Sequence, residues 1–372
     1  MRILYLCTFY HRAMLFRQQM DALEKRGHKV IAFNSTHYND PVPEKFISIM
    51  DEKVYHIECW NKIDRVLFFP RQWKTERKLL NKISLNDFDL VHSHLLLTTG
   101  YSALRFKKRY NIPYVVSVRN TDINGFMKVP GFKFLARKIL EESSGVIFIS
   151  NSHKKLLYDK FLTKKQIEMV EKKCVVIGNP LERFWELNTA SGRNKTINID
   201  KIRVLLVAKI KPIKNISVAA ETIEELCNRG YNAELTVVGE NQNQEEYDRI
   251  SKFKHTTILP FKTKEELIDI YREHDIFLLP SLEETFGRSY VEAMSQGLPV
   301  LYTKDQGFDN YYPNGLVGYA IPPDNPKIIA DKLELVLQNY SAMSNNAVHY
   351  CKDFYEDTII DRLEEFYRNA LD

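Results

Sequence analysis

The chain has 372 residues, of which 44% are hydrophobic and 27% charged, a composition typical of a soluble globular protein with room for two domains. No stretch approaches the ~18 consecutive apolar residues of a transmembrane helix, and the opening MRILYLCTFYHR becomes polar too soon for a secretory signal. The five cysteines stand singly, without the spacing of a disulfide framework or a zinc site, so we expect a cytoplasmic protein without a metal site.

The net charge of +5 is unevenly distributed between the two halves. Residues 1–180 hold 31 lysine and arginine residues against 17 aspartate and glutamate residues, a net +14, and the remainder has a net −9. A basic half of this kind indicates a negatively charged partner. The alternative is a basic surface that only faces water.

Short apolar runs rich in β-branched residues recur along the chain, each followed by a helical stretch. Uninterrupted apolar strands are typical of parallel sheets that helices cover on both faces. We therefore predict one parallel sheet in each half. The predicted strands are 2–7, 28–34, 88–94, 114–119, 145–150 and 174–179 in the first half, and 203–208, 233–239, 256–261, 276–281, 299–303 and 317–322 in the second.

The spacing between these strands supports the same alternation. Phe16, Met20 and Leu23 recur at helical spacing after the first strand. The polar segment 181–200, interrupted by Ser-Gly, is interpreted as a linker and the start of a second domain. The sequence thus predicts an α/β fold of two doubly wound, Rossmann-like domains facing across a cleft: residues 1–180, completed by a final helix at 357–372, and residues 181–356.

The stretch EETFGRSYVEAMSQGLPV (283–300) follows a buried strand and turns into a helix. Free N–H groups and the dipole at a helix start attract an anion. Thr285 is suited to cap this helix, and Gly287 lets a ligand approach the backbone. Glu284 and Glu292 flank the helix start, where carboxylates accept hydrogen bonds from sugar hydroxyls. The pattern predicts a diphosphate with a sugar on each side, unless Glu284 only complements the dipole and Glu292 only faces water.

These residues resemble the signature of the retaining family 4 glycosyltransferases, which have the GT-B fold. The resemblance rests on the E-x7-E spacing of Glu284 and Glu292, on the adjoining FG and EAM residues, and on GLPV at 297–300. VLLVAKIKPIKN (204–215) also resembles the family's second-domain strand and turn, with Lys209 and Lys214 at its two cationic positions. Weaker similarity extends over most of the chain.

The resemblance implies that the second domain binds a nucleotide diphosphate sugar, with UDP-sugar the first choice, and that the first domain binds the acceptor. Glu292 would contact the ribose, Lys209 and Lys214 the diphosphate, and Glu284 the donor sugar. Transfer would retain the anomeric configuration without a metal ion or cofactor, because lysines and the helix start stabilise the leaving charge. Lysines in such a turn are otherwise ordinary surface residues. The further implied donor-site positions are the backbone of Phe286 and Gly287 at the phosphates, Thr285 and Arg288 beside them, Phe261 and Lys262 near the base, and Gly239.

The first half departs from the family pattern near the donor sugar. The family usually has a histidine at the end of the fourth strand, whereas VVSVRNTD (115–122) places Arg119 there. Arginine cannot act as a base, but its planar fork binds hydroxyls or a phosphate. Arg119 is therefore a candidate catalytic residue together with Glu284, Lys209 and Lys214.

Basic and aromatic residues alternate in 62–83, 105–110 and 126–140. Helices of this composition can rest on anionic membranes. The expected partners are a nucleotide sugar, a glycan or polyprenyl-diphosphate-linked acceptor of bacterial capsule, exopolysaccharide or cell-wall synthesis, and the anionic inner face of the cell membrane. No nucleic-acid-binding module is visible, so nucleic acid is not expected. The alternative is that these aromatic residues are core and the lysines solvated.

Two other functions fit the same fold. A sugar-nucleotide epimerase or a phosphorylase is disfavoured by the full E-x7-E context and by the short chain, respectively. A non-catalytic relative that binds sugar nucleotide or glycan is supported by Arg119 alone.

Overall fold

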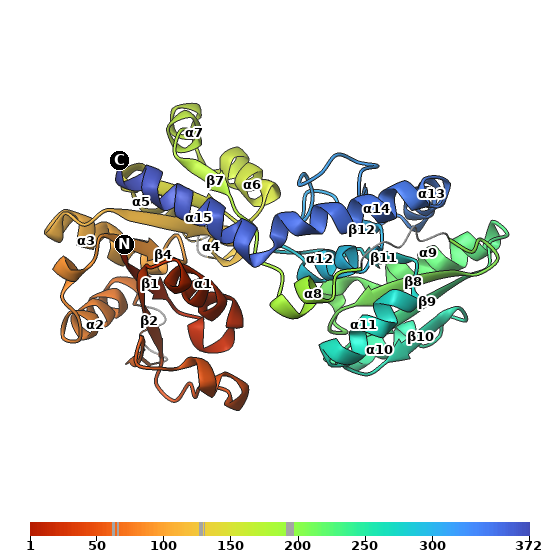
Figure 1. Cartoon of the computed structure of the whole chain (residues 1–372), viewed down its shortest axis with the longest axis horizontal. Coiled ribbons are helices and arrows are strands. Elements are labelled where there is room, and N and C mark those ends of the chain that lie inside the picture. The colour runs from red at the N-terminus through yellow and green to blue at the C-terminus, as the bar shows by residue number, and fades with distance from the viewer. Residues whose placement is uncertain (62–63, 65–66, 126–128, 130, 191–196) are drawn as a thin grey trace. The chain divides into compact units, whose positions relative to one another are not determined.

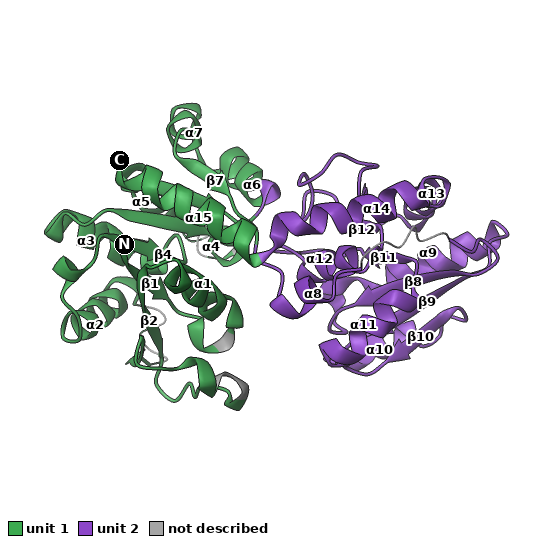
Figure 2. Cartoon of the chain, viewed as in Figure 1, with its two compact units in different colours: residues 1–149, 153–178, 356–372 green, residues 150–152, 179–355 purple. Residues whose placement is uncertain are grey.

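The computed structural model describes residues 1–372 except 62–63, 65–66, 126–128, 130 and 191–196 (Figure 1). It divides into two compact units (Figure 2), the first made of residues 1–149, 153–178 and 356–372 and the second of residues 150–152 and 179–355. The division lies close to the predicted boundary after residue 180. Each unit is an α/β domain with a parallel sheet, which confirms the predicted fold class.

The first unit contains a seven-stranded parallel sheet in the order β3-β2-β1-β4-β5-β6-β7. Its central strands are almost wholly buried, because helices cover both faces and the strand residues are apolar (Figure 1). The strands are β1 (Arg2–Cys7), β2 (Lys29–His37), β3 (Val54–Trp60), β4 (Leu90–Ser93), β5 (Tyr114–Val118), β6 (Gly145–Phe148) and β7 (Cys174–Val176).

The strand order reverses between β1 and β4, so right-handed crossovers place the helices on opposite faces of the sheet. On one face α1 packs against α15, and on the other α3 packs between α2 and α5. The helices of this unit are α1 (Met14–Lys25), α2 (Phe68–Leu80), α3 (Thr98–Tyr110), α4 (Asn120–Asn124), α5 (Phe132–Glu142), α6 (Asn151–Phe161), α7 (Lys164–Glu171) and α15 (Glu356–Leu371).

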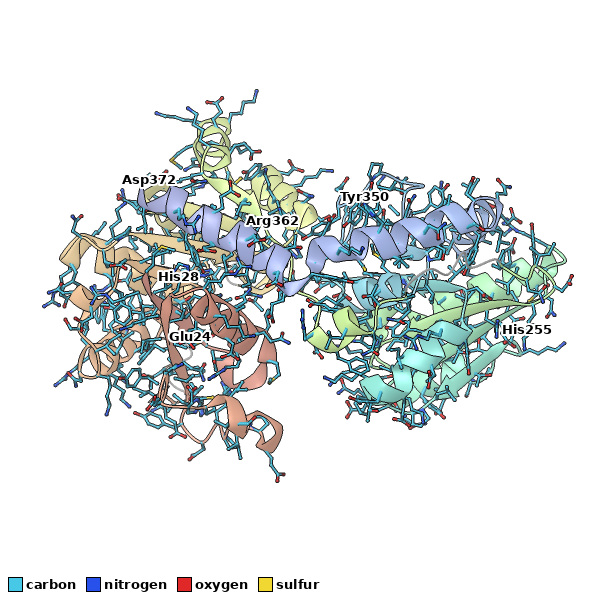
Figure 3. All side chains as sticks on the ribbon, in the orientation of Figure 1. Glu24, His28, His255, Tyr350, Arg362 and Asp372 are labelled. Atoms are coloured by element: carbon cyan, nitrogen blue, oxygen red, sulfur yellow. The ribbon has the colours of Figure 1, made fainter. Side chains whose placement is uncertain are left out.

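The C-terminal helix α15 is part of the first unit, although it follows the second unit in the chain. The hydroxyl of Tyr367 lies 3.1 Å from the Tyr5 hydroxyl and 2.6 Å from Nδ1 of His92, inside the sheet's core. Arg362, labelled on α15 in Figure 3, donates a hydrogen bond of 2.6 Å to the carbonyl of Val176 at the end of β7. Buried and surface contacts together therefore hold α15 on the sheet.

The second unit contains a six-stranded parallel sheet in the order β10-β9-β8-β11-β12-β13. Its strands are β8 (Ile202–Val207), β9 (Ala233–Val238), β10 (Thr256–Leu259), β11 (Ile276–Leu279), β12 (Val300–Thr303) and β13 (Gly318–Ile321). Its helices are α8 (Arg183–Leu187), α9 (Ile216–Asn228), α10 (Gln244–Ile250), α11 (Lys264–Glu273), α12 (Arg288–Ser295), α13 (Pro326–Gln338) and α14 (Tyr340–Tyr350).

Two elements differ from the prediction. The edge strand β3 was not predicted, because VYHIECW mixes polar and apolar residues and only its first and sixth residues are buried. The segment 181–200 is not a plain linker, because its described part includes the short helix α8, which buries Trp185. No helix in the described ranges is long and apolar enough to cross a membrane.

Candidate functional site

The turn between β11 and α12 is set by one glycine. Gly287 has φ = +82° and precedes the first residue of α12, Arg288. A Cβ at this position would lie 2.3 Å from ring atoms of Tyr290, so no other residue fits without a shift. Gly287 is the N-cap residue, and the prediction that Thr285 caps the helix is therefore wrong, because the helix begins two residues later than a Thr285 cap requires.

Glu284 is fixed by its backbone and by its side chain. Its N–H donates to Oε1 of Gln306 over 3.0 Å, and its carbonyl accepts the N–H of Gly307 over 2.9 Å. Its Oε2 lies 2.6 Å from Nζ of Lys214, and the two side chains are only 13% and 18% exposed. The structure thus brings together two predicted site residues that stand 70 positions apart.

Glu292 lies on α12, one turn beyond Arg288, and is half-buried. The hydroxyl of Tyr271 donates to its Oε2 over 3.4 Å. Burial raises the pKa of Glu292, although the Arg288 charge lowers it. Hydrogen bonds from a ligand would therefore stabilise the charged Glu292 carboxylate.

Arg288 contacts Glu182, a residue that the sequence analysis did not single out. Its guanidinium pairs with the carboxylate of Glu182, which also lies 3.5 Å from Nζ of Lys264. Burial alone raises the pKa of Glu182, but the Arg288 and Lys264 charges outweigh it, so that pKa is lowered. A carboxylate therefore neutralises Arg288 beside the start of α12.

The two predicted diphosphate lysines are held by different carboxylates. Lys214 ends a short 3-10 turn, Pro212–Lys214, and contacts Glu284. Lys209 follows β8, is 58% exposed and lies 3.3 Å from Oε2 of Glu240. Lys214 thus contacts the turn before α12, while Lys209 lies at the surface.

The remaining predicted donor-site positions lie around the same sheet edge or behind it. At Gly239, after β9, a Cβ would lie 1.9 Å from the Ala208 carbonyl, so this glycine permits close packing of two strand ends. Phe261 is 70% exposed, and Lys262 pairs with Glu266 over 2.8 Å. The Phe286 side chain is buried, so only its backbone is available to a ligand.

Arg119 belongs to the first unit, whereas the other predicted site residues belong to the second. It follows β5 and is the N-cap residue of α4. Its Nε donates to the carbonyl of His94 over 3.1 Å, and its guanidinium carbon lies 5.3 Å from the centre of the Phe16 ring. Asp122 accepts the Arg119 N–H over 3.0 Å. These contacts fix Arg119 at the carboxyl end of its sheet.

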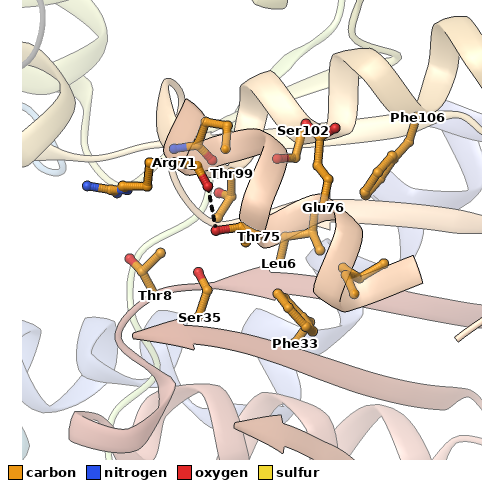
Figure 4. A pocket seen from close by; sticks show the side chains of 12 residues that line it. Leu6, Thr8, Phe33, Ser35, Arg71, Thr75, Glu76, Thr99, Ser102 and Phe106 are labelled. Carbon is orange, nitrogen blue, oxygen red and sulfur yellow. Dashed lines mark hydrogen bonds between the residues drawn. The ribbon is translucent and has the colours of Figure 1, made fainter. Parts of the chain in front are cut away.

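A narrow pocket opens in the first unit beneath α2, at the carboxyl ends of β1 and β2 (Figure 4). Thr8 and Ser35 from the strand ends face Arg71, Thr75 and Glu76 of α2. Oε2 of the buried Glu76 carboxylate accepts a hydrogen bond of 2.7 Å from Nε of Arg105 on α3. Oε1 of Glu76 has no hydrogen-bond partner within the described residues. The pocket's cavity of about 10 Å³ has room for a single water molecule, which these hydroxyls and the carboxylate can bind.

Sequence reasoning missed four residues of the second-unit site. Gln306, Gly307, Glu182 and Tyr271 reach Glu284, Arg288 or Glu292 from distant parts of the chain. Gly307 is required by the fold and not by a local pattern, because a Cβ there would lie 2.4 Å from the backbone of Thr285. The described residues include no cluster of histidine, cysteine, aspartate or glutamate that could hold a metal ion.

The second-unit geometry suits an anion with hydroxyl groups on either side. The start of α12 has no side-chain cap, Lys214 supplies a cation, and Glu284 and Glu292 supply acceptors. Two family models match the chain: "Glycosyltransferase Family 4" over residues 14–177 and "Glycosyl transferases group 1" over residues 189–353. The chain is a glycosyltransferase of the GT-B fold. The predicted glycosyltransferase class is thereby confirmed.

Characterised relatives extend the similarity beyond the two models. The alpha-monoglucosyldiacylglycerol synthase of Acholeplasma laidlawii is 24% identical to this glycosyltransferase over 379 residues, covering 95% of this chain and 92% of the synthase. The capsular polysaccharide biosynthesis glycosyltransferase CapM of Staphylococcus aureus is 24% identical over 262 residues, covering 65% of this chain and 67% of CapM.

A solved structure shows the same fold along the whole chain. Anabaena HepE, crystallised with UDP, has a TM-score of 0.71 and 15% identity to this glycosyltransferase, covering 99% of this chain and all of HepE. At such low identity the likeness concerns the fold alone.

Proposed function

We propose that this glycosyltransferase moves a sugar from a nucleotide diphosphate sugar to a glycan or lipid-linked acceptor, with retention of the anomeric configuration and without a metal ion. The observation that carries the proposal is the Lys214–Glu284 contact at the start of α12, one cation and one carboxylate held at a glycine turn. A diphosphate fits the cation and the helix start, and a sugar fits the carboxylate.

The donor site divides into two sides of the diphosphate. Glu292 accepts the ribose hydroxyls, and the backbone near Phe261 and Lys262 contacts the base. Glu284 accepts the donor-sugar hydroxyls on the other side. Lys209 is exposed and has a long side chain. It turns from Glu240 to the phosphates when the donor binds.

The leaving diphosphate is stabilised by groups that this chain already holds in place. Lys214 and the backbone N–H groups of Phe286 and Gly287 take up its charge as the glycosidic bond to the nucleotide breaks. Arg288 and Thr285 flank the same helix start, and Gly239 leaves room for the strand ends behind it. Arg119 supplies hydrogen bonds to a hydroxyl or phosphate from the first unit.

UDP-sugar is the donor we propose first, because HepE of the same fold was crystallised with UDP. Relatives named for capsular polysaccharide and for a glucosylated diacylglycerol suggest an acceptor of bacterial surface glycan or lipid origin. The acceptor contacts the first unit at the carboxyl edge of its sheet, where ligands of such sheets bind. We place the enzyme in the cytoplasm, at the inner face of the cell membrane where lipid-linked acceptors lie.

The proposal is tested by a thermal-shift panel of UDP, GDP, ADP, dTDP and CMP with their sugar conjugates. Stabilisation by the UDP series alone is expected, since a ligand that binds only the folded state raises the melting temperature. Glu292→Gln, which keeps the shape of the side chain and removes its charge, should reduce the UDP shift, because Glu292 is the proposed ribose contact. Absence of a shift with every nucleotide would contradict the proposal.

A non-catalytic relative is the second candidate, and Arg119 at the usual histidine position favours it. Such a protein would bind the sugar nucleotide identified in the panel without consuming it. Measuring release of free UDP from that sugar nucleotide, with and without added glycan acceptors, separates the two functions. An epimerase would instead convert the sugar while it stays attached to the nucleotide.

A further inference from the structure

Arg119 lies close to the point where the strand order of the first unit reverses. The reversal falls between β1 and β4, and Arg119 follows β5, the strand next to β4. Its Nε donates over 3.1 Å to the carbonyl of His94, the residue that follows β4. In doubly wound sheets the ligand binds outside the carboxyl ends of the strands at such a reversal. Arg119 thus lies where a ligand of the first unit is expected.

The positive charge of Arg119 is not paired within the described part of the chain. The bond to the His94 carbonyl is the hydrogen bond that its side chain makes there, and it forms no salt bridge. The nearby carboxylate of Asp122 instead accepts three backbone N–H groups. Burial lowers the pKa of Arg119, although the neighbouring Cys7 and Asp122 raise it. The described residues therefore compensate this charge only in part.

The aromatic, imidazole and thiol side chains beside Arg119 are neutral. Its guanidinium carbon lies 5.3 Å from the centre of the Phe16 ring, which packs against the imidazole of His94 with 4.8 Å between ring centroids. Burial lowers the pKa of His94, and both of its ring nitrogens lack a hydrogen-bond partner within the described residues. Burial also raises the pKa of the Cys7 thiol to about 11. None of these three side chains supplies a negative charge at neutral pH.

The two Nη groups of Arg119 are accessible to a ligand. The side chain is half-buried, and neither Nη is among the described buried atoms that lack a hydrogen-bond partner, so both reach space open to solvent. The parallel N–H groups of a guanidinium bind the two oxygens of a carboxylate or phosphate at once. A neutral hydroxyl would accept one hydrogen bond and leave the half-buried charge uncompensated. The geometry therefore favours an anion.

We propose that Arg119 makes this glycosyltransferase selective for an acidic sugar, whose carboxylate or phosphate group binds both Nη groups of the guanidinium. The inference rests on the proposed function, because it assigns a charge to one of the two sugars in the reaction, the transferred sugar or the sugar of the acceptor. The diphosphate of the donor is a separate anion, for which the second unit has Lys209, Lys214 and the start of α12.

Titration with UDP-glucuronate and UDP-glucose tests the transferred sugar. These two donors differ only at the sixth carbon of the sugar, where a carboxylate replaces a hydroxymethyl group. The unchanged protein should bind UDP-glucuronate about tenfold more tightly or better, the factor that a hydrogen bond to a charged group contributes. Arg119→Gln should remove this preference. Arg137→Gln is the matched control, because Arg137 is also half-buried and donates through Nε to a carbonyl, but lies in the middle of α5.

Free sugars test the acceptor. Glucuronate and glucose 6-phosphate are the acidic probes and glucose is the neutral reference, each titrated into protein saturated with UDP. A preference for the acidic probes that Arg119→Gln removes, without discrimination between the two UDP-sugars, would assign the acidic sugar to the acceptor. Arg119→Lys keeps the charge but not the planar fork, so it should retain only part of either preference. The melting temperatures of all variants without ligand show that they are folded.

Two outcomes would overturn the inference. One is equal binding of acidic and neutral sugars by the unchanged protein in both titrations, which includes no binding of either. The other is loss of the UDP-induced thermal shift in Arg119→Gln but not in Arg137→Gln, which would assign Arg119 to the diphosphate. In both cases the unchanged protein still responds to UDP and the proposed function stands. Absence of a shift with every nucleotide would instead contradict the proposed function itself.

Discussion

Lys214 and Glu284 form the closest contact between predicted site residues, and neither side chain is freely exposed. A ligand diphosphate would compete with the Glu284 carboxylate, because both attract the Lys214 ammonium group. A bound donor therefore has to share Lys214 with Glu284 or draw it away. Hydroxyls of the donor sugar can then donate hydrogen bonds to Glu284 in place of Lys214.

Lys214→Ala should weaken UDP binding by roughly 1.5–3 kcal/mol, the scale of a hydrogen bond to a charged group. Isothermal titration with UDP measures the change. Lys211→Ala, in the same turn, is the control and should bind UDP nearly as the unchanged protein does. Equal affinities for all three proteins would remove Lys214 from the diphosphate site.

The stability of the first unit is expected to depend on pH through the carboxyl group of Asp122. Its fully buried carboxylate accepts the N–H groups of Leu96, Leu97 and Arg119 over 3.0–3.2 Å. Burial raises its pKa to about 6, although those hydrogen bonds and the Arg119 charge lower it. The folded protein therefore holds this proton more tightly than the unfolded chain, whose pKa is 3.8.

Because the pKa of Asp122 is higher in the folded protein, its contribution to stability falls as pH rises. The contribution of Asp122 to the free energy of unfolding is greatest below pH ~4 and falls by about 3 kcal/mol as pH rises to ~6. Asp122→Asn lacks this titration, so its stability relative to the unchanged protein should rise over the same pH range. Urea unfolding of both proteins at several pH values checks this. Parallel pH curves would contradict it.

The residue scale also shows where sequence reasoning stops. Glu284, Glu292 and Gly287 could be proposed from the sequence because they lie within one short motif, whose spacing carries the information. Gln306 and Glu182 were not, because each reaches the site through a fold contact that no local pattern encodes. The cap was misassigned to Thr285 for a related reason: serine and threonine are common caps, but here a glycine with positive φ sets the helix start.

At the scale of elements, α15 is the clearest case of a helix that belongs to a distant part of the chain. Its residues Ile359, Ile360 and Leu363 are buried, and its Tyr367 reaches the centre of the sheet. The sequence predicted twelve strands from apolar runs, and these correspond to the described strands other than β3. An edge strand needs less apolar surface, which is why β3 gave no such run.

Tyr367→Phe should lower the free energy of unfolding by about 1–3 kcal/mol, because the Tyr5 hydroxyl and Nδ1 of His92 lose a buried partner. Arg368→Ala on the same helix breaks only an exposed pair with Glu364 and should cost at most about 0.5 kcal/mol. Urea unfolding of the two variants provides the comparison. A larger loss in Arg368→Ala would mean that surface charge, not the buried hydroxyl, holds α15.

At the scale of the whole molecule, the residues proposed for the donor and for the acceptor fall on different units. The donor residues lie in the second unit, apart from Arg119, while the proposed acceptor side lies in the first. Charge follows the same division, since the basic excess lies in residues 1–180. The sequence indicated this division through charge counts, but not that a C-terminal helix completes the first sheet.

Hydrogen exchange should reveal the division directly. UDP is expected to slow exchange chiefly at residues 209–215 and 281–292, because the proposed phosphate and ribose contacts lie there. Mass spectrometry of peptides with and without UDP measures it, and the buried strands β4 and β5 serve as an internal reference. Protection confined to the first unit would place the nucleotide elsewhere.

The path of the chain through the two units has a consequence for its synthesis. Residues 179–355 separate β7 from α15, so the first unit lacks its last helix until the sixteen residues of α15 have left the ribosome. The second unit, which is nearly continuous in sequence, can fold before that moment. The first unit is therefore completed last, and until then the part of its sheet that α15 covers, beside α1, stays open to chaperones.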